Sequence, residues 1–567
     1  MKSKLIPVAF LLIIVLAILL RTFRLDSIPP GLFGDEVDVG YQAYSLLETG
    51  RDLTGRFMPF YLKSLSEYRT PLYIYSAVPF VAIFGLNEWG VRLPAVFWGI
   101  ISIAGIFLVG RKLFGSKVGI IAMFLMSISP WHLQYSRASF EVTMLLSFLI
   151  FGTYFFLKGL EKNRYYFLSV VLLISSIYIY STAVAFVPML GLLMIILHWK
   201  QIIKTNIKTT LLIVLTAIIL LVPVGMSYIT GEAKERFSAI SIFQDTVLLD
   251  KLNLARKGEE FYSIDGEIEK ADPQKEIVFH NKLTVFTQVF ITNYFKSLSP
   301  SFLFSEGDIN FRQSIHEMGQ EYYFEAILLI LGMFALTKLD KRKAALIFVW
   351  LLLAPIPASL TNQGGFHATR LFIMLVPIAL LGGLGTGWIL DNWKHLSVKA
   401  VAAIVVVLFI LNFIFYLHRY YIHYGPESWR WWHIGFKESM SYVNSVEDQY
   451  TTVGFNNTYE PALIRFLFWN KYDPELFQNQ YRQTLEGREE IIPGFKGFRL
   501  GEKYFFGTTS QKSINESILP NMIYMVSARD EVPGDWNWAK TPPEGIKVLK
   551  TVYNPLGEPI FYVITKN

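Results

Sequence analysis

The chain opens on an uncharged apolar run, LIPVAFLLIIVLAILL, at Leu5–Leu20. Lys2 and Lys4 precede this run, and Arg21 and Arg24 follow it. A secretory signal would end in small residues at a cleavage site, and none follow here. Together with its flanks the run approaches the roughly 20 residues that cross a bilayer. It therefore predicts an uncleaved first membrane span.

The remainder of the chain is also rich in apolar stretches. Apolar residues make up 53% of the sequence, charged residues only 17%, and the mean hydropathy is +0.38. A soluble domain carries about 25% charged residues, so the composition excludes an ordinary soluble enzyme and a disordered chain. Ten further apolar stretches lie near residues 92–110, 118–133, 140–157, 165–180, 182–199, 209–229, 323–337, 344–361, 369–390 and 398–417.

The basic residues between these stretches predict the topology. If Pro71–Phe84 does not cross the membrane, the short loops on the side of Lys2 carry seventeen basic residues, and those on the other side carry only Arg137 and Arg370. The positive-inside rule favours this arrangement strongly. We therefore expect eleven spans in a protein of the plasma membrane, with the N-terminus cytoplasmic, the C-terminus extracytoplasmic, and Pro71–Phe84 as an interfacial helix.

Three large segments then lie outside, at 24–91, 230–322 and 419–567. Residues 1–418 are the expected membrane module. In the tail, 451–455, 521–526, 546–553 and 560–564 are typical of strands, and 461–472 is typical of a helix. The predicted fold is mainly α, a polytopic helical bundle with interfacial helices in the first external loop and a small C-terminal α/β domain.

Net charge and cysteine content exclude several functions. The net charge of +7 is accounted for by loops between spans, so it does not indicate nucleic acid as a partner. Membrane lipids are the expected surroundings. The chain has no cysteine, which excludes disulfides, thiolate metal sites and cysteine nucleophiles.

The first external loop carries the most informative acids. It begins Pro29-Pro30-Gly31-Leu32-Phe33-Gly34-Asp35-Glu36, a turn that leads into an amphipathic helix. Asp35 stands at the expected helix start, where Asp is favoured as an N-cap. Adjacent acids directly after a membrane span also suit a catalytic base, with Asp35 and Glu36 as the candidates.

Other polar clusters lie at predicted outer loop ends. Paired glycines beside His367 and Arg370 would let backbone and guanidinium approach a phosphate. Arg137 precedes a span in the same way, and anchoring in lipid headgroups is the alternative for both arginines. The candidate donor-phosphate ligands are Arg137, Arg370, His367 and Arg69, and the candidate substrate contacts are Glu67, Tyr68 and Glu141.

Several motifs occur in an order that resembles a known superfamily. They are Gly34-Asp35-Glu36, Tyr68-Arg69-Thr70-Pro71-Leu72-Tyr73, Glu88-Trp89-Gly90-Val91-Arg92-Leu93-Pro94-Ala95, Gly110-Arg111-Lys112-Leu113-Phe114-Gly115 and Ser136-Arg137. This set resembles the polytopic GT-C glycosyltransferases, in particular protein O-mannosyltransferases and lipid A aminoarabinose transferases. The resemblance covers roughly the first 160 residues, and beyond them mainly the span pattern and the arginine near span ten.

The resemblance implies a sugar transferase with a polyprenyl-phosphate donor and Asp35 as the base. In the aminoarabinose group a glutamate before the interfacial proline takes part in a metal site, and Glu67 is its counterpart here at a longer spacing. A divalent metal at Glu67 therefore stays open, and no cofactor is otherwise implied. The segment 230–322 is too short for the β-trefoil domain of protein O-mannosyltransferases, which weakens the case for a protein acceptor.

Elementary chemistry supports the same reading. An enzyme with its bulk outside cannot meet cytosolic nucleotide sugars, and a lipid-linked donor removes that difficulty. Phosphate is a good leaving group, so one carboxylate base suffices, and cations must stabilise the departing charge. The expected reaction is a single inverting displacement onto a lipid, glycan or protein acceptor. The alternatives are a glycan ligase that uses a pyrophosphate-linked donor and a lipid-linked sugar flippase or transporter.

Overall fold

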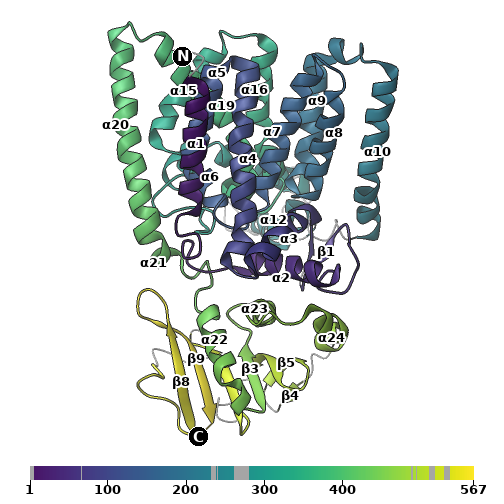
Figure 1. Ribbon diagram of the computed structural model, residues 1–567, viewed down its shortest axis with the longest axis vertical. Helices are drawn as coiled ribbons and strands as arrows, with labels where there is room; N and C mark the ends of the chain where they lie inside the picture. Colours follow the sequence, from purple (N-terminus) through teal and green to yellow (C-terminus); the bar gives the residue numbers. More distant parts are fainter. Residues whose placement is uncertain are drawn as a thin grey trace. The chain divides into compact units, whose positions relative to one another are not determined.

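The computed structural model describes residues 5–65, 67–231, 238, 240–260, 280–486, 490–492, 495–509, 518–528 and 537–566. Within these residues the fold is mainly helical, with one larger β-sheet near the C-terminus (Figure 1). The predicted fold class, a polytopic helical bundle with a small C-terminal α/β domain, is confirmed.

Eight helices are long and apolar enough to cross a membrane, counted over the described residues. They are α1 (Leu5–Thr22), α4 (Glu88–Phe114), α7 (Val142–Gly159), α9 (Thr182–Ile202), α10 (Ile207–Thr230), α16 with α17 (Lys341–Ser359), α18 with α19 (Ala368–Asp391) and α20 (Leu396–His418). Only 6% of the apolar window of α10 and 11% of that of α20 is buried within the protein. Apolar faces of that extent need a lipid surrounding, so the chain is an integral membrane protein.

Three other predicted spans form shorter apolar helices, α5 (Ser116–Ile128), α8 (Tyr165–Ser175) and α15 (Tyr323–Leu336). Helices α7, α8 and α10 lie side by side (Figure 1). The stretch predicted as one span at 118–133 is divided, because α5 ends before Ser129 and α6 (Pro130–Tyr135) begins after it. Pro130 disfavours helical backbone at the residue before it, and Ser129 has an extended ψ of 127°. The total of eleven spans stays a prediction.

The first external loop contains two helices. Helix α2 (Gly34–Thr49) follows the Pro29-Pro30-Gly31 turn and ends at Gly50, which has a φ of +68°. Glycine adopts this left-handed backbone without the usual steric cost. A short hairpin of β1 (Leu62–Lys63) and β2 (Tyr68–Arg69) leads to α3 (Pro71–Phe84). Pro71–Phe84 is helical as expected, and its interfacial position stays a prediction.

The predicted external segment 230–322 is described only in part, since residues 232–237, 239 and 261–279 lie outside the described ranges. Its described portion holds α12 (Thr246–Glu260) and α14 (Lys282–Ser297). Asn281 caps α14 with its side chain, accepting from the Thr284 backbone N–H at 2.9 Å.

The C-terminal domain is a seven-stranded sheet with helices. Its helices are α21 (Tyr424–Ser428), α22 (Phe436–Val446), α23 (Ala462–Trp469) and α24 (Pro474–Glu486). Its strands are β3 (Thr452–Asn456), β4 (Glu490–Ile492), β5 (Phe495–Leu500), β6 (Tyr504–Thr509), β7 (Met522–Ser527), β8 (Ile546–Tyr553) and β9 (Pro559–Lys566). The order is β4-β5-β6-β3-β7-β9-β8, with β3 parallel to β6 and β7.

The four strands and the helix predicted in the tail are confirmed, and β4, β5 and β6 were not predicted. Strand β7 is buried along its whole length, which explains why residues 522–526 form an unbroken apolar run before Ser527. Strands β5 and β6 carry mixed residues such as Lys496, Arg499 and Thr508, so the sequence pattern there is weak.

Backbone contacts divide the chain into two compact units. The first contains residues 1–20, 98–135 and 141–416, and the second contains 21–97, 136–140 and 417–567. The first external loop therefore belongs with the C-terminal domain. Within the second unit, α2 packs on α3, α23 and α24, and the Tyr41 hydroxyl of α2 donates to the Tyr472 carbonyl at 2.9 Å.

Candidate active site

Arg92 organises the loop that precedes α2. Its guanidinium is fully buried and donates to the carbonyls of Leu25 at 2.8 Å, Pro29 at 3.0 Å, and Gly31. These carbonyls belong to no helix or sheet, and buried acceptors without a donor are costly. Arg92 therefore fixes the Pro-Pro-Gly turn through three bonds.

Arg137 holds the same loop from a second segment. It is also fully buried, and its Nη2 donates to the carbonyls of Phe23 and Ile28, both at 2.8 Å. Its Nε donates to the Tyr420 hydroxyl at 3.1 Å. The sequence predicted Arg137 as a donor-phosphate ligand. Its geometry favours a structural role, because the guanidinium is buried among backbone carbonyls of its own unit.

Glu36 is the acidic partner of Arg92. Both side chains are 0% exposed, and Arg92 Nε lies 3.1 Å from Glu36 Oε1. The same oxygen accepts from the Ser139 backbone N–H at 3.0 Å. Burial raises the pKa of the Glu36 carboxyl, and Arg92 opposes that shift. Glu36 joins two distant segments at the start of α2, and its carboxyl is not open to solvent.

Asp35 differs from its neighbour because its carboxylate is 50% exposed. Arg69 Nη2 donates to Asp35 Oδ1 at 2.7 Å. The N-cap of α2 is Phe33, so the N-cap reading of Asp35 is wrong. Phe33 has an extended backbone, and the helix begins at Gly34, two residues earlier than that reading requires. Asp35 lies in the first turn, where the helix dipole favours a negative charge.

Arg69 is shared by three carboxylates. Besides Asp35, its Nε lies 2.7 Å from Asp38 Oδ2 and its Nη2 lies 3.2 Å from Glu67 Oε1. The arginine side chain is 9% exposed, and Asp38 also accepts from the Ser64 hydroxyl at 2.8 Å. Burial raises the pKa of Asp38, and Arg69 opposes the shift. Sequence reasoning predicted Arg69 as a phosphate ligand and gave no role to Asp38. The contacts favour Arg69 as the residue that orients Asp35.

None of these contacts tests the prediction that Glu67 binds a divalent metal. In the described part of the chain, no three Asp, Glu or His side chains are arranged to share a metal ion. Tyr68 follows Glu67 and is the first residue of β2. The Arg56 guanidinium lies 5.2 Å from the centre of the Tyr68 ring. Glu141 is half-buried at the start of α7, and its carbonyl accepts from Met144 and Leu145.

The C-terminal domain contributes a buried arginine beside α2. Arg465 of α23 is 1% exposed, and its Nη2 would lie 3.6 Å from a Cβ at Gly34. The same Nη2 is 2.6 Å from His433 Nδ1, and His433 Nε2 is 3.1 Å from Glu460 Oε1. Burial lowers the pKa of Arg465 to about 10, while Glu460 and Asp35 oppose this shift. Arg465 is thus a fourth arginine near the start of α2, after Arg92, Arg137 and Arg69, and the sequence gave no signal for it.

A second polar cluster lies in the other compact unit. Arg370 is half-buried, and its Nη1 donates to the Thr361 hydroxyl at 2.5 Å and to the Asn362 carbonyl at 3.1 Å. Asp308 is 8% exposed and accepts from the Ala368 backbone N–H at 2.8 Å. Burial raises the pKa of Asp308 to about 6, with Arg370 and Arg312 among the opposing influences.

His367 is half-buried and precedes the short helix α18 (Ala368–Leu371). The paired glycines before it allow close packing. A Cβ at Gly364 would collide with the Ala358 carbonyl, and one at Gly365 would lie 2.8 Å from the Lys296 Cβ. Asp308, which sequence reasoning did not single out, accepts from the backbone N–H of the residue after His367 and lies close enough to Arg370 for their charges to interact.

Comparisons with known proteins agree with the resemblance seen in the motifs. Residues 68–226 match the family model described as dolichyl-phosphate-mannose-protein mannosyltransferase. YkcB of Bacillus subtilis (strain 168), provisionally assigned as a mannosyltransferase, is 29% identical over 82 residues, which are 14% of this chain and 12% of YkcB. The predicted likeness to these glycosyltransferases is confirmed for the matched part of the chain.

Two solved structures are also similar. ArnT from Cupriavidus metallidurans, bound to undecaprenyl phosphate, has a TM-score of 0.49 and 11% identity, covering 99% of this chain and 98% of ArnT. The oligosaccharyltransferase AglB from Archaeoglobus fulgidus, in complex with an inhibitory peptide and a dolichol-phosphate, has a TM-score of 0.47 and 12% identity, covering 80% of this chain and 62% of AglB.

Proposed function

We propose that this protein is an inverting glycosyltransferase that moves one monosaccharide from a polyprenyl-phosphate donor to an acceptor hydroxyl at the outer face of the plasma membrane. The family match over 68–226 and the apolar helices support a membrane enzyme of this kind. The observation that carries the proposal is Asp35, a half-exposed carboxylate held by one buried cation.

Asp35 acts as the general base in this proposal. It takes the proton from the acceptor hydroxyl as the acceptor oxygen attacks C1 of the sugar. The bond between C1 and the phosphate oxygen breaks, and the lipid phosphate leaves with the electron pair. A single displacement inverts the anomeric centre. It needs one carboxylate, whereas glycoside hydrolases generally use two.

The surrounding charges position this base. Arg69 binds Asp35 Oδ1, and this contact orients the carboxylate. Glu36 and Arg92 fix the first turn of α2, and Arg137 fixes the loop before it. Groups held in place before the substrate arrives cost no reorganisation during the reaction, which is the main source of electrostatic catalysis. Glu36 thus supports catalysis as a positioning residue.

The donor phosphate is proposed to bind Arg370 and His367. Arg370 is half-buried, and its guanidinium offers several donors in one plane, which matches the geometry of phosphate. Asp308 fixes the backbone next to Arg370, because it accepts a hydrogen bond from the Ala368 N–H. Glu67, Tyr68 and Glu141 are proposed substrate contacts, with Glu67 also the candidate for a divalent metal. Arg370→Lys keeps the charge but loses the forked geometry, so we expect donor binding to weaken at least tenfold.

The decisive experiment has two stages. Mass spectrometry of cell-envelope glycans, with and without the gene, identifies the sugar and the class of acceptor: lipid, glycan or protein. The purified protein in nanodiscs is then given polyprenyl-phosphate hexoses and pentoses, and NMR reads the anomeric configuration of the product. Retention at the anomeric centre would contradict the single displacement. Transfer only from oligosaccharide pyrophosphate lipids would indicate a glycan ligase, and donor movement across the bilayer without transfer would indicate a flippase.

A further inference from the structure

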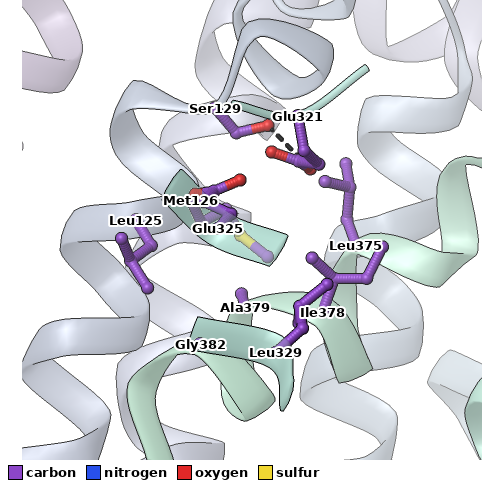
Figure 2. A pocket seen from close by; sticks show the side chains of 10 residues that line it. All are labelled: Leu125, Met126, Ser129, Glu321, Glu325, Leu329, Leu375, Ile378, Ala379 and Gly382. Atoms are coloured by element: carbon purple, nitrogen blue, oxygen red, sulfur yellow. Dashed lines mark hydrogen bonds between the residues drawn. The ribbon is translucent and has the colours of Figure 1, made fainter. Parts of the chain in front are cut away.

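Buried acids outside the candidate active site are paired with one another. Figure 2 shows the Ser129 hydroxyl and the carboxyls of Glu321 and Glu325 at one end of a small cavity whose remaining wall is apolar. The two carboxyls share a hydrogen bond, and Ser129 donates to Glu321 Oε1 at 3.1 Å. The space has room for about one water molecule. These groups therefore form a closed polar contact inside the protein, and the surface is the place to look for a further function.

The first external loop ends in a tip of apolar side chains at residues 57–60. Phe57, Met58 and Phe60 are 72%, 52% and 63% exposed. A single exposed apolar residue is ordinary on a protein surface, but three within four residues form a patch. Patches of this kind mark surfaces that meet a protein or a membrane.

The tip is held in this exposed position by its own hydrogen bonds. The Asp52 carboxylate is 0% exposed and accepts from the Arg56 backbone N–H at 2.9 Å and from Arg56 Nε at 3.1 Å. The Met58 backbone N–H donates to the Gly50 carbonyl at 3.1 Å. A loop fixed in this way keeps its apolar side chains in contact with the surroundings, which is costly in water and favourable in lipid.

The tip is joined to the exposed face of α3. The Tyr75 hydroxyl of α3 donates to the Pro59 carbonyl at 2.9 Å. Pro79 and Ile83 follow Tyr75 at intervals of four residues, so the three share one face of the helix. Pro79 is exposed, Ile83 is 75% exposed, and α3 carries no charged residue. The other face holds the buried residues Tyr73, Ala77 and Val81.

This apolar face continues onto a membrane helix. The ring centres of Phe80 in α3 and Phe97 in α4 lie 5.8 Å apart. Phe97 is 45% exposed, and α4 is long and apolar enough to cross a membrane. An exposed aromatic side chain on such a helix faces lipid, so the outer surface of α3 adjoins the lipid-facing surface of α4. Aromatic side chains are favoured at this boundary between lipid and water.

We propose that the 57–60 tip inserts into the lipid bilayer beside α3 and anchors the first external loop to the membrane surface. Gln42 of α2 is fully buried, donates to the Lys63 carbonyl at 2.8 Å and accepts from the Leu53 N–H at 3.0 Å. Both arms of the loop are thus bonded to α2, and the anchored tip sets the height of α2 above the bilayer. The proposal rests on the chain being a membrane protein and not on the sugar-transfer reaction.

Depth measurement by electron paramagnetic resonance tests the proposal. The full chain, which lacks cysteine, is labelled with a nitroxide at Met58→Cys and placed in lipid nanodiscs. Oxygen concentrates in lipid and a nickel chelate stays in water, so the ratio of label accessibility to the two reagents reports depth. We expect a several-fold higher ratio at Met58→Cys than at Leu556→Cys, which replaces a 62% exposed apolar residue in a turn of the tail. Ile83→Cys should resemble Met58→Cys.

A second variant tests whether the tip side chains cause the insertion. In the Met58→Cys background, combined Phe57→Ser and Phe60→Ser should remove most of the difference from Leu556→Cys. The melting temperature should stay unchanged because both rings are exposed. Leu556→Ser in the same background is the matched control and should leave the ratio unchanged. If Met58→Cys does not fold, Phe60→Cys is the reporter.

Three results would overturn the proposal. A ratio at residue 58 equal to that of Leu556→Cys would place the tip in water. Protection of the label from both reagents would show that a protein, such as a second copy of the chain, covers the tip. A ratio unaffected by the two Phe→Ser changes would show that these side chains do not hold the tip in lipid.

Discussion

Asp35 and Arg69 form an ion pair with a 2.7 Å contact in which the carboxylate is half exposed and the guanidinium is only 9% exposed. The exposed partner is therefore the one that can meet a substrate, and the buried partner sets its orientation. Asp38 and Glu67 bind the same guanidinium from other sides. Arg69 cannot turn toward a new ligand without leaving at least one carboxylate unpaired.

Asp35→Asn should abolish most transfer while leaving the fold intact. The amide keeps the shape of the side chain but cannot accept the proton of the acceptor hydroxyl, and loss of a general base costs about a hundredfold or more. Donor binding should persist. The measurement is the initial rate of sugar transfer in nanodiscs, with melting temperature as the folding check. Asp26→Asn, the same change at an exposed position of the preceding loop, is the matched control. Near-normal transfer in Asp35→Asn would exclude Asp35 as the base.

Arg92→Ala should destabilise the protein strongly. Glu36 would remain buried without its cation, and breaking such a pair costs about 3–5 kcal/mol. Glu36→Gln should cost less, about 1–2 kcal/mol, because the amide oxygen can still accept from the Ser139 N–H while Arg92 keeps its carbonyl acceptors. Denaturant unfolding followed by tryptophan fluorescence measures both. Arg24→Ala, at an exposed arginine of the same loop, should have little effect. Equal stability of Arg92→Ala and Arg24→Ala would contradict this account of the loop.

The stability of the protein should fall as pH rises from about 4 to 6, in part because of Asp308. Its carboxyl has a pKa of about 6 in the folded chain and an ordinary value near 3.8 when unfolded. In this window the folded state holds a proton that the unfolded state has lost, so raising the pH favours unfolding. A shift of two pKa units corresponds to about 3 kcal/mol. Asp308→Asn cannot titrate and should show a flatter melting-temperature profile from pH 4 to 7. Identical profiles of melting temperature against pH for the wild type and Asp308→Asn would show that the raised pKa of Asp308 does not affect stability.

The predicted sidedness can be read by thiol labelling, because the chain contains no cysteine. Ser116→Cys, in a loop predicted to be cytoplasmic, should resist a membrane-impermeant thiol reagent in intact cells and react after permeabilisation. Leu556→Cys lies in a turn between β8 and β9 and is 62% exposed in the wild type, so it should react in intact cells. The reverse labelling pattern would invert the topology.

The sequence was most informative where a local signal was strong. The Pro-Pro-Gly turn and the acids behind it predicted where α2 begins to within one or two residues, and the apolar runs of β7 and β9 predicted the tail strands. It failed where a role depends on distant partners. Glu36 and Arg92 are 56 residues apart, and Arg465 reaches α2 from the far end of the chain. No periodicity reports such pairs, and the contacts of Arg137 with the carbonyls of Phe23 and Ile28 could not be read from the sequence either; its role as a phosphate ligand stays a prediction.

The start of α2 has a consequence for the design of hybrid enzymes. Arg137 bonds to Tyr420, the carbonyl of Trp432 packs against Gly31, and Arg465 stands beside Gly34. The tail is therefore not an interchangeable appendage. Exchanging residues 417–567 between relatives should succeed only when segments 21–97 and 136–140 are transplanted with them, because the three share one interior.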